Sequence, residues 1–277
     1  MESVMDLSNY VYAAPEMVLL GLICVVLVVD LFVEDHNRHI TFLAALAAIV
    51  ATIATLLGTA PAETTLVFSG AYVADPLSTV LKVATAGFVA IVFIYSRGYL
   101  GANDLHKGEF YTLGLFGLLG MMIMMSANSL LTMYLGLETL ALSQYALVAI
   151  DRKNVVSAEA AMKYFVLGAI ASGSFLYGIS WIYGTTGHLQ FDSIANVVAS
   201  DPAVNSLGLW FGLAFLLVGI AFKFGAVPFH MWLPDVYNGA RSPVTLYVAS
   251  APKIAAFALT FRILVDGLGG LHPVWND

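Results

Sequence analysis

Charged residues are scarce in this chain of 277 residues. Asp, Glu, Lys and Arg together make up 10% of the sequence, whereas 60% is hydrophobic. Soluble domains usually carry about 25% charged residues. This deficit excludes an ordinary soluble domain and a disordered chain, and it indicates a protein that crosses a membrane several times.

Cysteine and basic clusters are also nearly absent. The single cysteine, Cys24, lies in an apolar run, so it has no internal disulfide partner and is interpreted as a packing residue. With a net charge of −7 and no basic block, nucleic acid is excluded as a partner. The sequence contains no CxxC pair, phosphate loop or dinucleotide fingerprint, so we expect neither redox chemistry nor a bound cofactor or metal in this chain.

Long apolar runs account for most of the sequence. A membrane-spanning helix needs about 20 mostly apolar residues. Eight stretches meet this requirement: 15–34, 39–58, 76–96, 109–127, 129–150, 157–183, 207–227 and 243–266. The sequence therefore predicts an all-α, polytopic membrane helix bundle of about eight transmembrane helices. The longer connections predict a β-hairpin within 59–75 and a short surface helix within 184–206.

The basic residues of the connections are distributed unevenly. The connections after spans one, three, five and seven contain six of them: Arg38, Arg97, Lys107, Arg152, Lys153 and Arg241. The N-terminal segment and the other three connections between spans contain none. Because basic loops remain on the cytoplasmic side, both ends of the chain are predicted to face the outside. The N-terminal segment also lacks the basic start of a signal peptide, so the first span is expected to be retained.

Several charged residues fall inside the predicted spans, where a charge at mid-depth costs about 2.5–3.5 kcal/mol. Lys82 and Arg262 lie near span ends and are interpreted as anchors that reach the membrane interface. Glu138 and Lys253 lie near the middle of their spans. For Lys163, two turns into its span, position alone leaves both interpretations open.

The seventh predicted span contains residues that interrupt a helix. Gly225 and Pro228 weaken the helix, so we predict one half ending near Phe224, an unwound stretch, and a second half up to about Tyr237. This places Lys223 at mid-depth beside freed backbone groups. Irregular backbone at that depth occurs only inside protein or along a wet cavity, and broken helices commonly form ion sites in transporters. A proline-kinked structural helix is the alternative.

Together these residues suggest a proton relay. The candidates are one carboxylate, three lysines and one histidine: Glu138, Lys163, Lys223, Lys253 and, as a further possibility, His230. Burial and a neighbouring carboxylate act on the proton affinity of a lysine in opposite directions, so the affinity is adjustable. His230 is the only histidine in the broken element, and histidine is the side chain most often used to exchange protons.

Four sequence runs resemble a known family. The run 222–237 is similar to the broken-helix signature of the antiporter-like membrane subunits of respiratory complex I, the proton-translocating NADH:quinone oxidoreductase. The run 235–245 resembles subunit N more than subunits L or M or cation/proton antiporter chains, and the runs 137–145 and 163–178 are also similar to subunit N. The resemblance implies that Glu138 and Lys223 form the charge pair of a proton channel. It also implies that Lys163 lies beside them and that Lys253 carries protons toward the membrane centre.

The resemblance also implies a domain organisation. Residues 1–108 correspond to an N-terminal three-helix segment, 109–268 to a five-helix antiporter-like repeat, and 269–277 to a tail on the outer side. Members of this family normally contain a second, inverted repeat, so a chain ending at Asp277 is expected to be a fragment. Arg241 occupies a position where a small residue or proline is expected.

The function implied is that of a translocase subunit without redox chemistry of its own. NADH, FMN, iron–sulfur clusters and quinone are expected on partner subunits. The expected surroundings are the other membrane subunits of complex I and the lipid of a bacterial inner membrane, with the N-terminus on the periplasmic side. The alternatives are a stand-alone cation/proton antiporter chain and a structural membrane scaffold that transports no ions.

Overall fold

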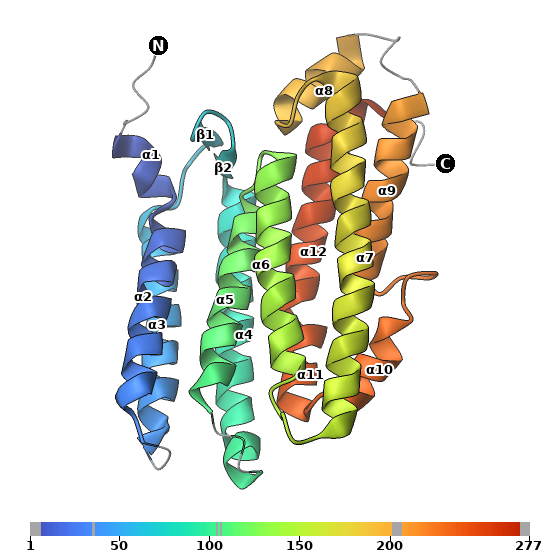
Figure 1. The fold of residues 1–277 in the computed structure, drawn as a ribbon. Helices are drawn as coiled ribbons and strands as arrows, with labels where there is room; N and C mark the ends of the chain where they lie inside the picture. Colours follow the sequence, from blue (N-terminus) through green and yellow to red (C-terminus); the bar gives the residue numbers. More distant parts are fainter. Residues whose placement is uncertain (1–6, 35–36, 104, 106, 201–206, 272–277) are drawn as a thin grey trace.

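The computed structural model describes residues 7–34, 37–103, 105, 107–200 and 207–271. Long helices run side by side, and chain neighbours are antiparallel (Figure 1). The N-terminal half contains α1 (Leu7–Tyr12), α2 (Ala14–Phe32), α3 (His39–Gly58), α4 (Pro76–Ala102), α5 (Gly108–Met125) and α6 (Leu130–Val148). The C-terminal half contains α7 (Val155–Thr186), α8 (Phe191–Ser200), α9 (Leu207–Phe224), α10 (Trp232–Gly239), α11 (Ser242–Ala249) and α12 (Ala251–Phe261). A π-helical turn, Arg262–Gly267, and a 3₁₀ turn, Gly269–Leu271, follow.

Seven helical segments in the described ranges are long and apolar enough to cross a membrane. The last of them, Ser242–Gly267, combines α11, α12 and the π-helical turn. The remaining predicted span, 129–150, corresponds to α6, which lies beside α5 and α7 (Figure 1) but is less apolar because it contains Glu138 and Gln144. The predicted all-α membrane bundle is confirmed. Cys24 is exposed on α2, so the packing role predicted for it is not inside this bundle.

Helix α5 forms the centre of the bundle. In the membrane-spanning stretch of α5, 78% is buried inside the protein, compared with 28% for α2. Glycines allow close helix contacts: a Cβ atom at Gly136 on α6 would lie 2.9 Å from the carbonyl oxygen of Gly120 on α5. A Cβ atom at Gly178 on α7 would lie 2.8 Å from the Gly212 carbonyl oxygen on α9. Small residues of this kind let membrane helices pack backbone to backbone, and they hold α9 firmly against α7.

A hairpin and a short helix cover the upper end of the bundle in Figure 1. Strands β1 (Thr65–Val67) and β2 (Tyr72–Ala74) pair antiparallel, and α8 supplies the predicted surface helix. The hairpin is joined to the α5–α6 turn because the Val73 amide donates to the Ser126 carbonyl at 2.8 Å. The next residue after β2, Asp75, caps α4 through a reciprocal pair of hydrogen bonds with Ser78. Both predicted elements are confirmed.

The predicted interruption of the seventh span is present. Helix α9 ends at Phe224, and Gly225 follows with φ +73°, a left-handed conformation that favours glycine. Helix α10 begins at Trp232, so residues 225–231 form the predicted unwound stretch between the two halves. The Trp232 indole donates to the Phe222 carbonyl at 2.9 Å, which ties the second half of the element back to the first.

A second interruption was not predicted. The last span is divided at Ser250, between α11 and α12, and Pro252 follows in the first turn of α12. Proline cannot donate a backbone hydrogen bond, so it is tolerated at the start of a helix rather than in its interior. The last span therefore consists of two helices, and Lys253 lies in the first turn of the second one, α12.

The helix ends and connections that contain the six basic residues lie at one end of the bundle, the lower end in Figure 1. Arg97 belongs to the final turns of α4 rather than to a connection. Arg241, after α10, forms an ion pair with Asp151 from the α6–α7 connection, with an Nε to Oδ2 distance of 2.9 Å. An acidic partner therefore accommodates Arg241 where a small residue was expected.

Candidate functional site

Lys223 lies in the last turn of α9, inside the bundle, and is only 8% exposed. Its amine donates to the side-chain oxygen of Gln144 on α6 at 3.0 Å. The hydroxyl of Tyr164 on α7 donates to the same oxygen, also at 3.0 Å. Three helices therefore meet at one neutral amide, and the position of Lys223 in the interior confirms its predicted burial.

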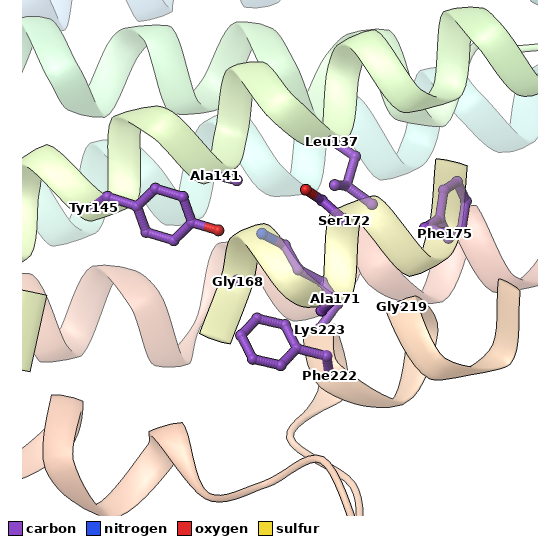
Figure 2. A pocket seen from close by; sticks show the side chains of 10 residues that line it. All are labelled: Leu137, Ala141, Tyr145, Gly168, Ala171, Ser172, Phe175, Gly219, Phe222 and Lys223. Atoms are coloured by element: carbon purple, nitrogen blue, oxygen red, sulfur yellow. The ribbon is translucent and has the colours of Figure 1, made fainter. Parts of the chain in front are cut away.

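A narrow cavity lies beside the Lys223 amine (Figure 2). The hydroxyl groups of Tyr145 and Ser172 lie on either side of the amine. The cavity has a volume of about 10 Å³, which is room for roughly one water molecule. Gly168 makes space for Tyr145, because a Cβ atom there would lie 1.9 Å from the tyrosine hydroxyl. The site thus has polar groups around the amine, and the rest of its lining is mostly apolar side chains and glycines.

Glu138 lies on α6, half-buried, near this cavity but not in contact with Lys223. Among the described residues, no ion pair joins the two, and the Glu138 Oε1 atom is buried without a hydrogen-bond partner. The charges of Glu138 and Lys253 both act on the Lys223 amine. Tyr134, one turn before Glu138, interacts with Glu138 and with Ser172, which lines the cavity. Polar groups thus connect the carboxylate to the lysine without a direct contact.

Lys253, on α12, holds the end of the broken helix. Its amine donates to the backbone carbonyls of Lys223 and Phe224, both at 2.9 Å. These carbonyls are among the last of α9 and lack partners within the helix, and a positive charge at a helix C-terminus is favourable. The same amine lies 5.5 Å from the centre of the Trp232 ring. Lys253 therefore joins α12 to both halves of the interrupted element.

Lys163 and His230 do not reach the cavity. The side chain of Lys163 is 43% exposed and forms ion pairs with Glu159 at 3.0 Å and with Asp235 of α10 at 3.1 Å. His230 is exposed in the non-helical stretch between α9 and α10. The structure brings Lys223 and Lys253 together near Glu138, and it places the other two candidates outside this group.

Two polar residues at the site were not among the predicted relay residues. Gln144 and Tyr164 complete the surroundings of Lys223, yet each is neutral and stands within an apolar helix. Their signal was present, since a buried amide or hydroxyl in a membrane helix requires a partner. Which partner it finds depends on the packing of α6 against α7 and α9.

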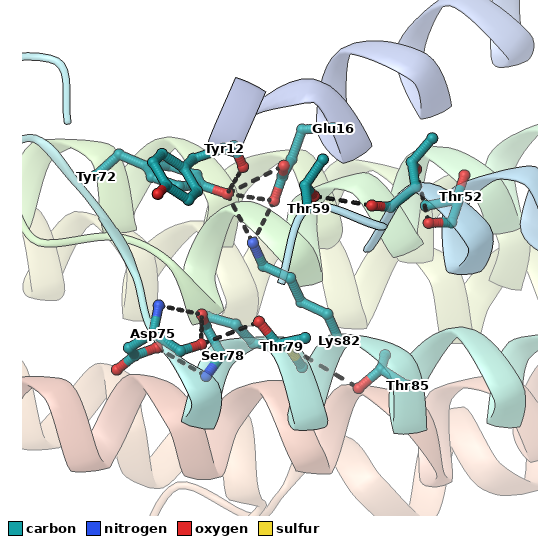
Figure 3. Close-up of polar contacts among 12 residues, drawn as sticks. Tyr12, Glu16, Thr52, Thr59, Tyr72, Asp75, Ser78, Thr79, Lys82 and Thr85 are labelled. Carbon is teal, nitrogen blue, oxygen red and sulfur yellow. Dashed lines mark hydrogen bonds and ion pairs between the residues drawn. The ribbon is translucent and has the colours of Figure 1, made fainter. Parts of the chain in front are cut away.

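The interpretation of Lys82 as an interface anchor is wrong. Lys82 is 3% exposed and forms an ion pair with Glu16 of α2 at 2.5 Å (Figure 3). Its amine also donates to the Tyr72 hydroxyl at 2.8 Å. Burial raises the pKa of Tyr72, so this hydroxyl keeps its proton and donates to the Glu16 carboxylate at 3.1 Å. The buried acid makes the interior favourable for the lysine.

The same interpretation is wrong for Arg262. This residue is 5% exposed and forms an ion pair with Asp75, the capping residue of α4, at 2.7 Å. It also pairs with Asp266 at 3.0 Å. Arg262 therefore joins the last span to α4 inside the protein. Neither ion pair includes a residue of the Lys223 cavity.

No group of three or more His, Cys, Asp or Glu side chains in the described ranges is arranged to hold a metal ion.

Comparison with known proteins identifies the family. The family described as "NADH:quinone oxidoreductase/Mrp antiporter, TM" matches residues 127–275, a segment that includes Glu138, Lys223 and Lys253. The chain belongs to this family. The match begins at the α5–α6 turn and covers the whole site around the broken helix.

Relatives within the family are similar over nearly the full chain. The chain is 51% identical to NADH-quinone oxidoreductase subunit N of Thioalkalivibrio sulfidiphilus, covering 98% of this chain and 56% of that protein. It is 47% identical to the subunit N of Nitrosomonas europaea, with 98% and 56% covered. The chain thus spans about half the length of the curated relatives it matches.

Solved structures show the same family fold. A chain of respiratory complex I from Thermus thermophilus matches with a TM-score of 0.74 and 32% identity, covering 90% of this chain and 52% of that one. A chain of the Mrp complex from Dietzia matches with a TM-score of 0.76 over 96% of this chain and 50% of that one. Its identity of 20% shows likeness of fold alone.

Proposed function

We propose that this chain is part of a proton-translocating membrane subunit of a bacterial NADH:quinone oxidoreductase. The observation that carries the proposal is the buried Lys223 amine at the end of the broken helix, bound to the neutral Gln144 oxygen beside a water-sized cavity. A scaffold gains nothing from a lysine at this depth, because an apolar residue avoids the cost of burying the charge.

The neutral acceptor suits a group that must release its proton. A carboxylate in direct contact holds an ammonium more strongly than an amide oxygen does. Glu138 acts on Lys223 through its electric field rather than through a contact. A change in the protonation of Glu138 therefore alters the proton affinity of Lys223 without breaking a hydrogen bond between them.

The proposed path runs from α6 through α9 to α12. Glu138 sets the proton affinity of Lys223, and Lys223 exchanges its proton with Lys253 through water. Lys253 lies close to Lys223, because its amine donates a hydrogen bond to the Lys223 backbone carbonyl. We assign Lys163, paired with Asp235, and the exposed His230 to the mouth of this path rather than to its buried part.

The rest of the assignment follows from the relatives. At 47–51% identity, the relatives named NADH-quinone oxidoreductase subunit N favour the oxidoreductase over a stand-alone antiporter. In this proposal NADH, FMN, iron–sulfur clusters and quinone belong to partner subunits, and the other membrane subunits of the complex surround this chain. Residues 1–108 form the N-terminal segment, 109–268 the proton-conducting repeat, and 269–277 an outer tail, of which 272–277 lie outside the described residues.

We also propose that the lower end of the bundle in Figure 1 lies on the cytoplasmic side of the inner membrane, since it contains the basic connections. In a Cys24→Ser background, Lys153→Cys should react with an impermeant maleimide only in inside-out vesicles. Glu63→Cys, exposed near the hairpin, should react only in right-side-out vesicles. Labelling with the opposite pattern contradicts this orientation.

Replacing Glu138 with Gln tests the proposed tuning. The substitution keeps the shape of the side chain and removes its field, so proton uptake per NADH oxidised is expected to fall about tenfold, the effect of one pKa unit. The measurement uses the assembled complex in sealed vesicles. Glu63→Gln, at an exposed position, is the matched control and should pump normally. An unchanged proton-to-electron ratio for Glu138→Gln, with normal assembly, contradicts the proposal.

A further inference from the structure

A groove of about 500 Å³ lies between α2, α5 and α6 at the lower end of the bundle. Its walls are mostly apolar and include Leu27, Leu113 and Phe116. Ala146 near the end of α6 and Ala149 just after it line the groove, whereas Leu137 and Ala141 of the same helix line the Lys223 cavity. The groove is therefore separate from the proposed proton path, and its size is typical of a binding site for one small molecule.

Charged groups of both signs stand at the groove. Asp30 is already paired, because its carboxylate accepts from Arg38 at 2.5 Å and from Thr41 at 2.8 Å. Arg152 and Glu109 form a different kind of pair, with an N to O distance of 2.9 Å and side chains that are 72% and 47% exposed. An exposed ion pair contributes little stability. The Arg152–Glu109 pair can therefore separate at little cost, and each side chain can bind the oppositely charged group of a ligand that carries both a cation and an anion.

We propose that this groove binds one phospholipid with a zwitterionic, amine-bearing headgroup of the phosphatidylethanolamine type. An acyl chain lies along Leu113 and Phe116, the phosphate binds Arg152, and the ammonium binds Glu109. Arginine suits a phosphate because its planar fork donates two parallel hydrogen bonds. Each member of the existing ion pair thus gains an oppositely charged partner on the lipid.

The charges favour a lipid over a helix of a neighbouring subunit. A transmembrane helix seldom offers a cation and an anion close together at one end. The groove opens among helices that span the membrane, where lipid is the surrounding solvent.

The test uses the full protein in its complex, reconstituted in phosphatidylglycerol vesicles. A trace of phosphatidylethanolamine with a photoreactive acyl chain is added, and labelled residues are mapped by mass spectrometry. Labelling should concentrate on the groove residues of α5 and α6. Diacylglycerol with the same photoreactive chain should label them about tenfold less, since it lacks the charge-assisted contacts.

Matched variants separate specific binding from general contact with the bilayer. Arg152→Gln should lower the labelling about tenfold, the loss of one charge-assisted contact, whereas Lys153→Gln should not. Ala146→Trp fills the groove and should also lower it, whereas Leu135→Trp, at an exposed position of the same helix, should not. Even labelling over all lipid-facing residues, no response to Arg152→Gln, or crosslinks from the groove to a helix of another subunit would overturn the proposal.

Discussion

Replacing Lys223 with alanine is expected to lower proton translocation by the assembled complex about 100-fold or more, the usual contribution of a positioned acid–base group. The substitution removes the proton carrier and leaves Gln144 bound to Tyr164. Because Lys223 is in the last turn of α9 and has no carboxylate in contact, its loss strands no counter-ion, so the bundle should still fold.

Lys223→Arg sharpens this test. Arginine keeps the positive charge but does not release a proton at working pH, so this variant should assemble and also fail to pump. Lys153→Ala, in the exposed α6–α7 connection, is the matched control. Assembly, quinone reductase rate and proton uptake are measured for each variant in sealed vesicles. If Lys223→Ala assembles and keeps the parental proton-to-electron ratio, the relay assignment is wrong and a scaffold role is favoured.

Replacing Lys82 with methionine is expected to lower the free energy of unfolding by about 3–5 kcal/mol, the usual cost of removing one partner of a buried ion pair. Glu16 is left without its cation in the interior, where Tyr72 alone still donates to it. Methionine fills a similar volume, so lost packing contributes little to the effect.

The double variant Glu16→Gln/Lys82→Met separates charge from shape. It removes both charges and retains an acceptor for Tyr72, so it should recover most of the lost stability. Denaturant unfolding in detergent, followed by tryptophan fluorescence, measures both variants. Lys153→Met, at an exposed site, should differ little from the parent. Equal destabilisation in the single and double variants would show that packing, and not the stranded carboxylate, decides the cost.

Much of the fold could be predicted from local patterns. Spans, hairpin and the break after Phe224 each depend on properties of consecutive residues: apolar length, β-branched alternation, and glycine or proline within a helix. The break at Ser250 carries a similar signal in Pro252. It was missed because a proline that opens a helix and a proline inside one look alike until the helix end is known.

The partners of buried charges could not be predicted in this way. Lys82 pairs with a residue 66 positions away and Arg262 with one 187 positions away. Snorkelling requires only a nearby interface, whereas burial requires an acid brought close by tertiary packing. Lys223 illustrates the same limit, because the resemblance pointed to Glu138 and the structure provides Gln144 as the hydrogen-bonded group. A charge inside a membrane span is costly and therefore stands out in the sequence, whereas a neutral polar residue does not.

The contact of Lys253 with the end of α9 makes one amine serve two purposes. Its hydrogen atoms close the carbonyl end of the broken helix at Lys223 and Phe224, and its charge strengthens that closure, an effect of about 0.3–1 kcal/mol at a helix terminus. If Lys253 carries protons as proposed, each proton that leaves it weakens these hydrogen bonds between α12 and α9, and each proton that arrives strengthens them. The protonation state of Lys253 then sets how firmly the end of the broken helix is held to the last span.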